Sequence, residues 1–360
     1  MSGGVDSSVA AYLLKEQGIE VIGLSFELWD KRDLEDSNVC CSIETINLAR
    51  SVAESLGIEH RTIDVRDAFY HHVIEDFCAS YIKGITPNPC ILCNEHIKFA
   101  FLMKEAERSG AELIATGHYA RIDRPQHRSA AAPQDRDPKR FLLKKGVDLK
   151  KDQSYVLYVM KQEELAKTVF PLGEMNKEET RSIARKLGLA TALRPESQEI
   201  CFVGNADYAD FIRGFSPDAL TPGPVVDING RTIGEHRGIA HYTIGQRKGL
   251  GISSLKPHYV AEIDIDKNTI IAGAREDAMK KSFTVSRLNW ISISDLLQPM
   301  RADVKIRSTS KERPATIRPG ENRTVLVDFD EPQWAPAPGQ SAVFYSGDHV
   351  IGGGIIEWSA

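Results

Sequence analysis

Met1-Ser-Gly-Gly-Val-Asp-Ser-Ser8 opens the chain, and an apolar-periodic run from Val9 to Gln17 follows it directly. Two adjacent glycines let the backbone adopt positive φ and come close to a ligand. Main-chain N–H groups and three serine hydroxyls then lie at the positive end of a helix, which is a site for anions. The bland alternative is a Ser/Gly-rich turn with Asp6 as a helix cap. We expect a phosphate-binding loop, because loop, cap and helix occur in the right order.

The loop lacks the lysine of G-x-x-x-x-G-K-[ST], which disfavours a P-loop NTPase. It resembles instead the S-G-G-x-D-S signature of the PP-loop ATP pyrophosphatases. Members of that superfamily cut ATP between its α and β phosphates and adenylate a substrate. The resemblance implies that ATP binds to the whole loop, namely Ser2, Gly3, Gly4, Val5, Asp6, Ser7 and Ser8.

Strands and helices alternate after this loop. We expect strands at residues 19–26, 60–65 and 112–116, with helices at 42–56, 67–83 and 95–109. The alternation predicts an α/β fold whose parallel sheet binds ligands at the carboxyl ends of its strands. Phe26 and Gly117 lie at such ends. A loop of this type should itself follow a strand, so we expect an apolar segment of about five or six residues upstream of Met1.

The second half of the chain has a different pattern. Gly and Pro become dense beyond Cys201, and short alternating segments from Ser282 onward predict a small β-barrel. A chain of 360 residues exceeds the size of a single core. We therefore predict a PP-loop catalytic domain at 1–200, a small central domain at 201–277 and a C-terminal β-barrel at 278–360.

Composition limits the location and the partners. No apolar run approaches a membrane span, and no signal peptide precedes the loop, so we expect a cytoplasmic protein without membrane contact. The net charge is -5, yet residues 231–256 hold five basic residues against one acidic residue. Residues 301–323 hold seven against three. Each stretch is either a phosphate-binding face or an ordinary solvated surface.

Seven motifs in order resemble those of the bacterial tRNA-specific 2-thiouridylases, and the resemblance runs from Met1 to Trp358. They are the loop itself, Pro-Asn-Pro-Cys-x-x-Cys-Asn at 87–94, Ala-Thr-Gly-His-Tyr-Ala-Arg at 115–121, Lys-Asp-Gln-Ser-Tyr at 151–155, Ser-Gln-Glu-Ile-Cys at 197–201, Tyr-Thr-Ile-Gly-Gln-Arg-Lys-Gly-Leu-Gly at 242–251 and Pro-Gly-Gln-Ser-Ala-Val-Phe-Tyr at 338–345.

The resemblance implies sulfur transfer to C2 of the wobble uridine in tRNAs for Glu, Gln and Lys. ATP, expected with Mg²⁺, would first adenylate the uridine O2. A cysteine desulfurase or a sulfur-relay protein would supply the sulfur. The family's persulfide-bearing cysteine falls on Cys201 and its nucleophilic partner on Cys93, which together close a disulfide during the reaction.

Further site residues follow by the same transfer. Phe26 and Gly117 would complete the ATP site, and Asn88, Pro89 and Cys90 would line the target base. That base must be flipped out, because C2 is inaccessible in a stacked anticodon loop. Contacts to tRNA would come from His118, Lys151, Asp152, Gln153, Arg307, Ser308 and Gln340. The common Arg-Tyr-Arg of the family reads Arg307-Ser308-Thr309 here.

Cys90 departs from the commoner pattern, in which this position is Asp. With Cys93 and Cys201 it would supply three thiolates to a [4Fe-4S] cluster, leaving one iron open to bind hydrosulfide. Alternatively, Cys90 merely replaces Asp in a persulfide enzyme. A zinc site with His96 is disfavoured, since a closed site needs four ligands and no second C-x-x-C is present. We expect the remaining cysteines, Cys40, Cys41 and Cys78, to be packing thiols.

Two other functions remain open. The chain fits another PP-loop enzyme, such as a GMP, NAD or argininosuccinate synthetase, in which an amine attacks the adenylate. That chemistry has no need of Cys93 and Cys201. The chain also fits a catalytically inactive RNA-binding relative, which would not turn ATP over to AMP.

Overall fold

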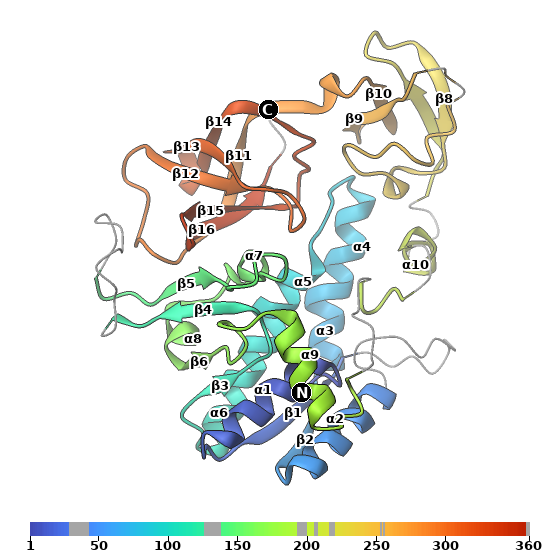
Figure 1. The fold of residues 1–360 in the computed structure, drawn as a ribbon. Helices are drawn as coiled ribbons and strands as arrows, with labels where there is room; N and C mark the ends of the chain where they lie inside the picture. The colour runs from blue at the N-terminus through green and yellow to red at the C-terminus, as the bar shows by residue number, and fades with distance from the viewer. Residues whose placement is uncertain are drawn as a thin grey trace.

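The computed structural model describes residues 1–28, 43–125, 138–192, 200–204, 208–215, 220–252, 254 and 256–357. Three regions are visible in Figure 1: an α/β region at the bottom, a barrel at the upper left and a smaller sheet at the upper right. The predicted fold class, an α/β domain followed by a small central domain and a β-barrel, is confirmed. The boundaries at 200/201 and 277/278 stay predictions. No helix among the described residues is long and apolar enough to cross a membrane.

Helix α1 (Val5–Glu16) starts directly from the loop. Gly18 ends it with a φ of 74°, and the N–H of Ile19 donates to the carbonyl of Leu14, a left-handed helix stop. Strand β1 (Ile22–Glu27) then pairs in parallel with β2 (Glu59–Asp64), and α2 (Ile43–Leu56) connects them. This is the predicted parallel arrangement, although the first strand begins later than the apolar run does.

Two long helical runs follow. The first comprises α3 (Arg66–Phe69), η1 (Tyr70–Ile74) and α4 (Glu75–Ile82); the second comprises α5 (Pro89–Leu92), η2 (Cys93–Phe99) and α6 (Ala100–Ser109). Both runs contain a π-helical segment, η1 and η2 respectively, a feature frequent at functional sites. The second run begins at Pro89, earlier than predicted, because proline suits the first turn of a helix.

The rest of the α/β region holds a second parallel pair and a hairpin. Strand β3 (Ile114–Ala115) pairs with β6 (Thr168–Val169), and β4 (Ala120–Asp123) pairs with β5 (Leu142–Lys145). Three helices complete it: α7 (Ser154–Leu157), α8 (Gln162–Lys167) and α9 (Lys177–Lys186). Helix α9 begins with a capping box, since the Asn176 side chain accepts from the Glu179 N–H at 3.0 Å and the Asn176 N–H donates to the Glu179 carboxylate at 2.7 Å.

The central region contains α10 (Tyr208–Phe215) and a four-stranded sheet in the order β8-β7-β10-β9. Its strands are β7 (Gly223–Val226), β8 (Thr232–His236), β9 (Tyr259–Asp264) and β10 (Thr269–Gly273). The barrel is antiparallel and closes where its first strand pairs with its last. Its strands are β11 (Met279–Trp290), β12 (Met300–Lys305), β13 (Arg313–Pro319), β14 (Val325–Trp334), β15 (Ser341–Ser346) and β16 (His349–Ile356). The short 3-10 turns are η5 (Ile239–His241), η6 (Glu276–Ala278) and η7 (Glu321–Arg323).

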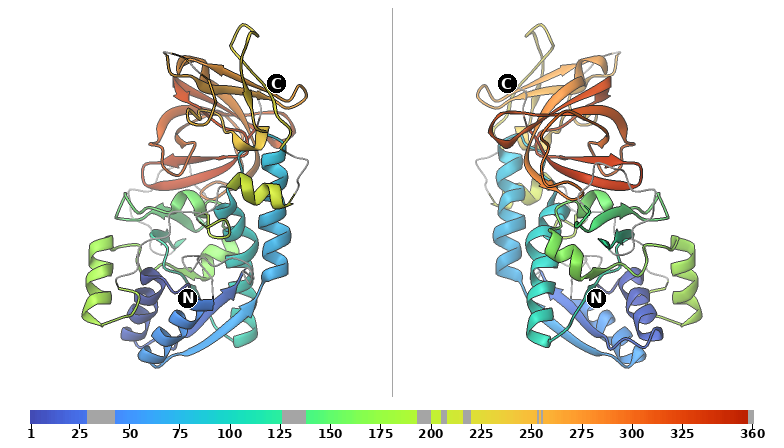
Figure 2. Two further views of the ribbon diagram at one scale, coloured as in Figure 1. Left: turned by 90° about the vertical axis from the view of Figure 1, so that its right-hand side faces the viewer. Right: turned by 90° about the vertical axis from the view of Figure 1, so that its left-hand side faces the viewer.

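The barrel packs directly on the α/β region (Figure 2). Tyr155 donates its hydroxyl to the Ser341 carbonyl at 2.9 Å, and the Tyr158 hydroxyl lies 3.1 Å from the Ser341 hydroxyl. Gly353 makes room for the Tyr158 ring, which would lie 2.8 Å from an added Cβ. A shared hydrophobic core therefore fixes the barrel in one orientation.

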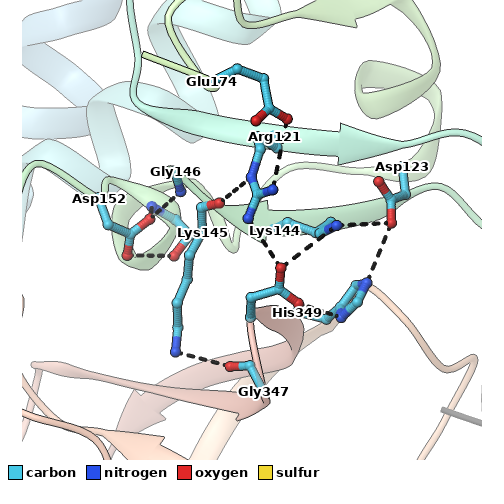
Figure 3. Close-up of polar contacts among 11 residues, drawn as sticks. Arg121, Asp123, Lys144, Lys145, Gly146, Asp152, Glu174, Gly347 and His349 are labelled. Carbon is cyan, nitrogen blue, oxygen red and sulfur yellow. Dashed lines mark hydrogen bonds and ion pairs between the residues drawn. The ribbon is translucent and has the colours of Figure 1, made fainter. Parts of the chain in front are cut away.

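Charged groups flank this core (Figure 3). Asp348 of the barrel accepts from Arg121 at 3.0 Å and lies 3.6 Å from Lys144. His349 pairs backbone to backbone with Lys144 and contacts Asp123 at 3.4 Å. The β4–β5 hairpin thus extends the barrel sheet, which adds a polar layer to the apolar contact.

Candidate functional site

The N-terminal loop folds back on itself. Gly3 has a φ of 67°, and a Cβ there would lie 2.4 Å from the Thr45 carbonyl of α2, so only glycine fits. The Ser2 N–H donates to the Ser7 hydroxyl at 3.1 Å, while Ser8 donates its hydroxyl to the Gly4 carbonyl at 2.9 Å. The loop is therefore preorganised at the start of α1, where helix N–H groups favour an anion.

Gly117 lies against this loop, as expected. An added Cβ would come within 2.7 Å of the Asp6 carbonyl carbon and 2.8 Å of the Ser7 nitrogen, so the turn after β3 touches the first turn of α1. Phe26 lies on β1 and packs edge to face on Phe101, with ring centroids 6.4 Å apart. The structure thus places both residues near the carboxyl ends of parallel strands, where nucleotides bind in α/β folds.

A lysine that the sequence analysis missed completes the loop. The Lys177 ammonium lies 2.8 Å from both carboxylate oxygens of Asp6, and its side chain is only 9% exposed. The Tyr119 hydroxyl is 2.9 Å from the same carboxylate and 2.9 Å from the Thr180 hydroxyl. A cation absent from the loop sequence is therefore supplied by α9, from far along the chain.

One signal could have found Lys177. It occupies the first turn of α9, where the helix dipole favours acidic side chains and disfavours a cation. The two residues after it, Glu178 and Glu179, follow the usual preference. A buried lysine in that position indicates a specific anionic partner, which the structure identifies as Asp6.

The two predicted catalytic thiols converge on one hydrophobic cluster. Cys93 is 6% exposed and starts the π-helical segment η2. Cys201 packs at the edge of the same cluster, next to the fully buried Phe202. Phe26 of β1 packs against this cluster too. The structure therefore packs Phe26, which we expect in the nucleotide site, and both thiols in one hydrophobic cluster.

The other cysteines divide as follows. Cys90 is exposed in the first turn of α5, after Asn88 as its N-cap and Pro89. Cys78 is fully buried, and burial raises the pKa of its thiol to about 12, as suits a packing residue. All four described cysteines are thiols rather than disulfides. Cys40, Cys41 and residues 197–199 of the Cys201 motif lie outside the described residues.

No metal site is preformed in the part of the chain that the structure describes. There, no group of three or more His, Cys, Asp or Glu side chains is arranged to hold a metal ion. Cys90 is exposed while Cys93, one helical turn later, is buried. The thiols as placed do not fit a three-cysteine cluster site.

Several residues expected to touch tRNA have partners within the protein. The Nδ1 atom of His118 is hydrogen-bonded to the Thr116 hydroxyl at 2.8 Å, and the His118 ring stacks on Phe99. Burial, with a contribution from Lys98, lowers the pKa of His118 to about 3, so its ring is neutral at physiological pH. Any contact it makes with RNA is therefore a neutral hydrogen bond and not a phosphate ion pair.

The Lys151–Gln153 motif is connected to the N-terminal loop through hydrogen bonds. The Asp152 carboxylate accepts from the Gly146 and Ser154 N–H groups, each at 3.1 Å (Figure 3). Gln153 forms two hydrogen bonds with the backbone of Tyr119, at 3.0 and 2.9 Å. Because Tyr119 reaches Asp6, this motif is linked to the phosphate loop through one side chain.

Arg307 connects the barrel to the central region. Its guanidinium donates to the carbonyl of Ile244 at 3.0 Å and to that of Ala335 at 2.7 Å. Burial lowers its pKa, although the neighbouring Tyr155 opposes this shift. Ser308 is exposed beside it. The guanidinium thus holds two regions together, and only Ser308 faces outward.

The two basic stretches differ in the structure. In residues 231–256 all five basic side chains are exposed: Arg231, Arg237, Arg247, Lys248 and Lys256. In residues 301–323, Arg301 forms a two-point ion pair with Asp330, and Arg318 pairs with Asp328 at 3.0 Å. All five basic side chains of the first stretch are therefore exposed, whereas Arg301, Arg307 and Arg318 of the second stretch are engaged within the protein.

Comparison with known proteins gives a full-length match. Three family profiles cover the chain in order: a tRNA methyl transferase HUP domain at residues 1–205, a tRNA methyl transferase PRC-barrel domain at 209–274 and an aminomethyltransferase beta-barrel domain at 280–356.

Individual relatives agree with these profiles. The tRNA-specific 2-thiouridylase MnmA 2 of Thermoanaerobacter sp. (strain X514) is 48% identical, over 99% of this chain and 96% of its own length. MnmA 1 of Caldanaerobacter subterraneus subsp. tengcongensis is 49% identical over the same shares. MnmA of Clostridioides difficile (strain 630) is 47% identical, over 100% of this chain and 97% of its own length.

A solved structure is more distant. The U34-tRNA thiolase NcsA from Methanococcus maripaludis with its [4Fe-4S] cluster is 18% identical, with a TM-score of 0.34 over 61% of this chain and 65% of that chain. At this similarity its cluster says nothing about the present cysteines.

The Lys177–Asp6 pair yields a first prediction. Lys177→Met keeps the length of the side chain and removes its charge, which leaves a partly buried carboxylate unpaired beside the phosphate site. A charge 4 Å away contributes on the order of 4 kcal/mol near a protein surface, so we expect ATP to bind at least about tenfold more weakly. Isothermal titration with ATP measures this.

The exposed Lys186→Met, at the other end of α9, is the matched control and should bind ATP normally. The double variant Asp6→Asn/Lys177→Met removes both charges. It should bind ATP better than Lys177→Met alone if the lysine acts by neutralising Asp6. Unchanged ATP binding by Lys177→Met would show that the pair is only structural.

Proposed function

Since the chain belongs to the tRNA-specific 2-thiouridylase family, we propose that it catalyses ATP-dependent transfer of sulfur to C2 of a tRNA uridine. The observation that carries this proposal is that Cys93 and Cys201 pack in one hydrophobic cluster, which Phe26 of β1 also contacts. A PP-loop enzyme in which an amine attacks the adenylate would have no use for this pair of thiols. The substrates inferred from the resemblance are the wobble uridines of tRNAs for Glu, Gln and Lys.

Adenylation comes first, because the uridine O2 is a poor leaving group. In the proposed reaction O2 attacks the α-phosphorus of ATP, pyrophosphate leaves, and O2 becomes part of an AMP ester. The N–H groups and hydroxyls of residues 2–8 would hold the phosphates, and Lys177 keeps Asp6 from repelling them. The Mg²⁺ we propose would arrive with the nucleotide, since the described residues form no preassembled carboxylate site.

Sulfur transfer follows. The donor, a cysteine desulfurase or a sulfur-relay protein, would leave a persulfide on Cys201. The Cys93 thiolate then attacks Sγ of Cys201, the inner sulfur of the persulfide. A Cys93–Cys201 disulfide forms, the bond to the outer sulfur breaks, and hydrosulfide leaves. Hydrosulfide adds to C2, the C2–O2 bond breaks, and AMP departs with the oxygen. A thiol reductant resets the disulfide. In the alternative route the terminal persulfide sulfur attacks C2 directly.

The base pocket and the location complete the proposal. The flipped uridine would lie near Asn88, Pro89 and Cys90, which start the helix that carries Cys93. The exposed basic surface of residues 231–256 would bind tRNA phosphates. We propose that the enzyme works in the cytoplasm, where tRNA and the sulfur donor are available.

The thiol mechanism predicts the outcome of cysteine replacement. Cys93→Ser and Cys201→Ser should each lower 2-thiouridine formation by more than about a thousandfold, because a hydroxyl neither carries nor displaces persulfide sulfur. Binding of ATP and tRNA should persist. Mass spectrometry of tRNA nucleosides measures the product. Cys78→Ala, at a packing thiol in the same cluster, is the control for folding. Normal 2-thiouridine in Cys201→Ser would contradict the mechanism.

An iron–sulfur route makes an opposite prediction about Cys90. We propose that Cys90 replaces Asp in a persulfide enzyme, because the thiols do not form a metal site as placed. Anaerobically purified protein should then be colourless, and Cys90→Asp should retain activity. Brown protein with about four irons per chain, lost together with activity in Cys90→Asp, would instead establish a [4Fe-4S] carrier.

The basic surface predicts a salt effect. Arg247→Glu/Lys248→Glu should weaken tRNA binding and reduce the slope of log K against log salt by roughly two, since each neutralised phosphate contributes about one. Filter binding across a salt series measures the slope. Arg313→Glu/Lys311→Glu, on exposed residues of the other basic stretch, is the matched control. An unchanged slope in the first variant would show that this surface does not contact tRNA.

A further inference from the structure

The segment between α4 and α5, residues 83–88, is held by the central region on one side. A Cβ on Gly84 would lie 3.1 Å from Ile263 and 3.3 Å from Ile239, so the backbone passes close to both. The Thr86 hydroxyl donates to the Thr243 hydroxyl at 3.3 Å. Figure 1 shows α4 rising from the α/β region to this place, with α5 beside it.

The barrel holds the same segment on the other side, through its turn at residues 338–340. The Thr86 N–H donates to the Pro338 carbonyl at 2.9 Å. The side-chain nitrogen of Gln340 lies 3.2 Å from the Thr86 carbonyl and 3.1 Å from the Pro87 carbonyl. This side chain therefore engages two consecutive backbone carbonyls of the α/β region.

The barrel turn at residues 338–340 is itself fixed by hydrogen bonds within the barrel. Gly339 has a φ of 88°, and a Cβ there would lie 2.2 Å from an Ile85 side-chain carbon and 2.8 Å from the Thr86 carbonyl oxygen, so only glycine fits between the turn and the segment. The Gly339 N–H donates to the Ile356 carbonyl at 2.9 Å, and the Ile356 N–H donates to the Gln340 carbonyl at 2.8 Å. The last barrel strand thus anchors the turn.

These contacts to residues 83–88 position the helix that carries Cys90 and Cys93. Pro87 is followed by Asn88, the N-cap of α5, and then by Cys90 and Cys93. The N-terminus of α5 has no side-chain cap hydrogen bond of its own. Its starting point is set instead by the backbone of residues 86 and 87, which the barrel turn and the central region hold.

We propose that Gln340 is a positioning residue for sulfur transfer: it fixes the Thr86–Pro87 backbone from the barrel, so that α5 presents Cys90 and Cys93 to the target base. Thr243 acts on the same segment from the central region. This inference rests on the proposed function, and it assigns to the Gln340 amide nitrogen a contact within the protein. The side-chain nitrogen of that amide lies within hydrogen-bond distance of two protein carbonyls.

Gln340→Leu tests the proposal, because leucine has a similar volume and no donor. At saturating ATP and tRNA we expect kcat for 2-thiouridine formation to fall on the order of tenfold, as for the loss of one or two hydrogen bonds. The KM for tRNA should change by less than about twofold, since no RNA contact is removed. Gln298→Leu, at an exposed barrel residue, is the matched control and should match the wild type.

Two readouts are independent of catalysis. Hydrogen exchange of the Thr86 amide should be faster in Gln340→Leu, because its hydrogen bond to Pro338 is less firmly held. Alkylation of the exposed Cys90 by iodoacetamide should change in rate. These measurements can be made even if the protein forms no 2-thiouridine. That result would contradict the proposed function, and the positioning role would then be tested by hydrogen exchange alone.

The outcomes separate the alternatives. A raised KM for tRNA with unchanged kcat would overturn the proposal and identify Gln340 as an RNA contact. Unchanged kcat, exchange and alkylation would also overturn it. If Gln340→Leu does not fold, Thr243→Val probes the same segment from the central region, and an unchanged kcat together with unchanged Thr86 exchange would count against the proposal.

Discussion

The burial of Phe202 is the interaction on which the proposed chemistry depends. Its ring lies 5.7 Å from that of Phe69, 5.1 Å from Phe77 and 5.4 Å from Phe211. Full burial of such a side chain contributes about 1.5–3 kcal/mol, and each aromatic pair adds about 0.5–1.5 kcal/mol. This anchor brings the short segment around Cys201 to the first helical run, and Cys93 of the second helical run belongs to the same cluster. Local propensity could not do this, because the described residues 200–204 form a turn and no helix or strand.

Features with a local cause could be predicted from the sequence. The loop glycines, the stop at Gly18, the capping box at Asn176 and the alternating barrel strands each depend on neighbours within a few residues. The roles of Lys177, Arg307 and Gln340 could not be predicted in the same way. Each of these side chains contacts a group far away in the chain, so no spacing reveals the partner. The resemblance pointed to two of them, yet it could not distinguish an RNA contact from a contact within the protein.

Charge counting shows the same limit. Residues 231–256 and 301–323 have an equal excess of positive charge. That charge is available to a ligand only where folding does not bring an acidic group next to it. Folding pairs Arg301 and Arg318 with carboxylates on β14 and uses Arg307 as an internal link. The other stretch lies on loops and edges of the central sheet, where its side chains point to solvent. Which basic side chains stay exposed is therefore decided by topology more than by composition.

The contacts that both β regions make with residues 83–88 link these regions to the helix that carries Cys90 and Cys93. A tRNA is far larger than the uridine that reacts, so contacts with its body and placement of one base must be coordinated. Here the two β regions, one of which carries the basic surface proposed to bind tRNA, hold the backbone that starts the helix bearing Cys90 and Cys93, through Thr243 on one side and Gln340 on the other. Because the tyrosine-rich core and the Asp348 network fix the barrel on the α/β region, a shift in that turn cannot be absorbed by tilting the whole barrel. It must pass to Thr86 and Pro87, and so to the first turn of α5. In the proposed positioning role, the β regions would act on the chemistry through the backbone geometry of residues 86 and 87.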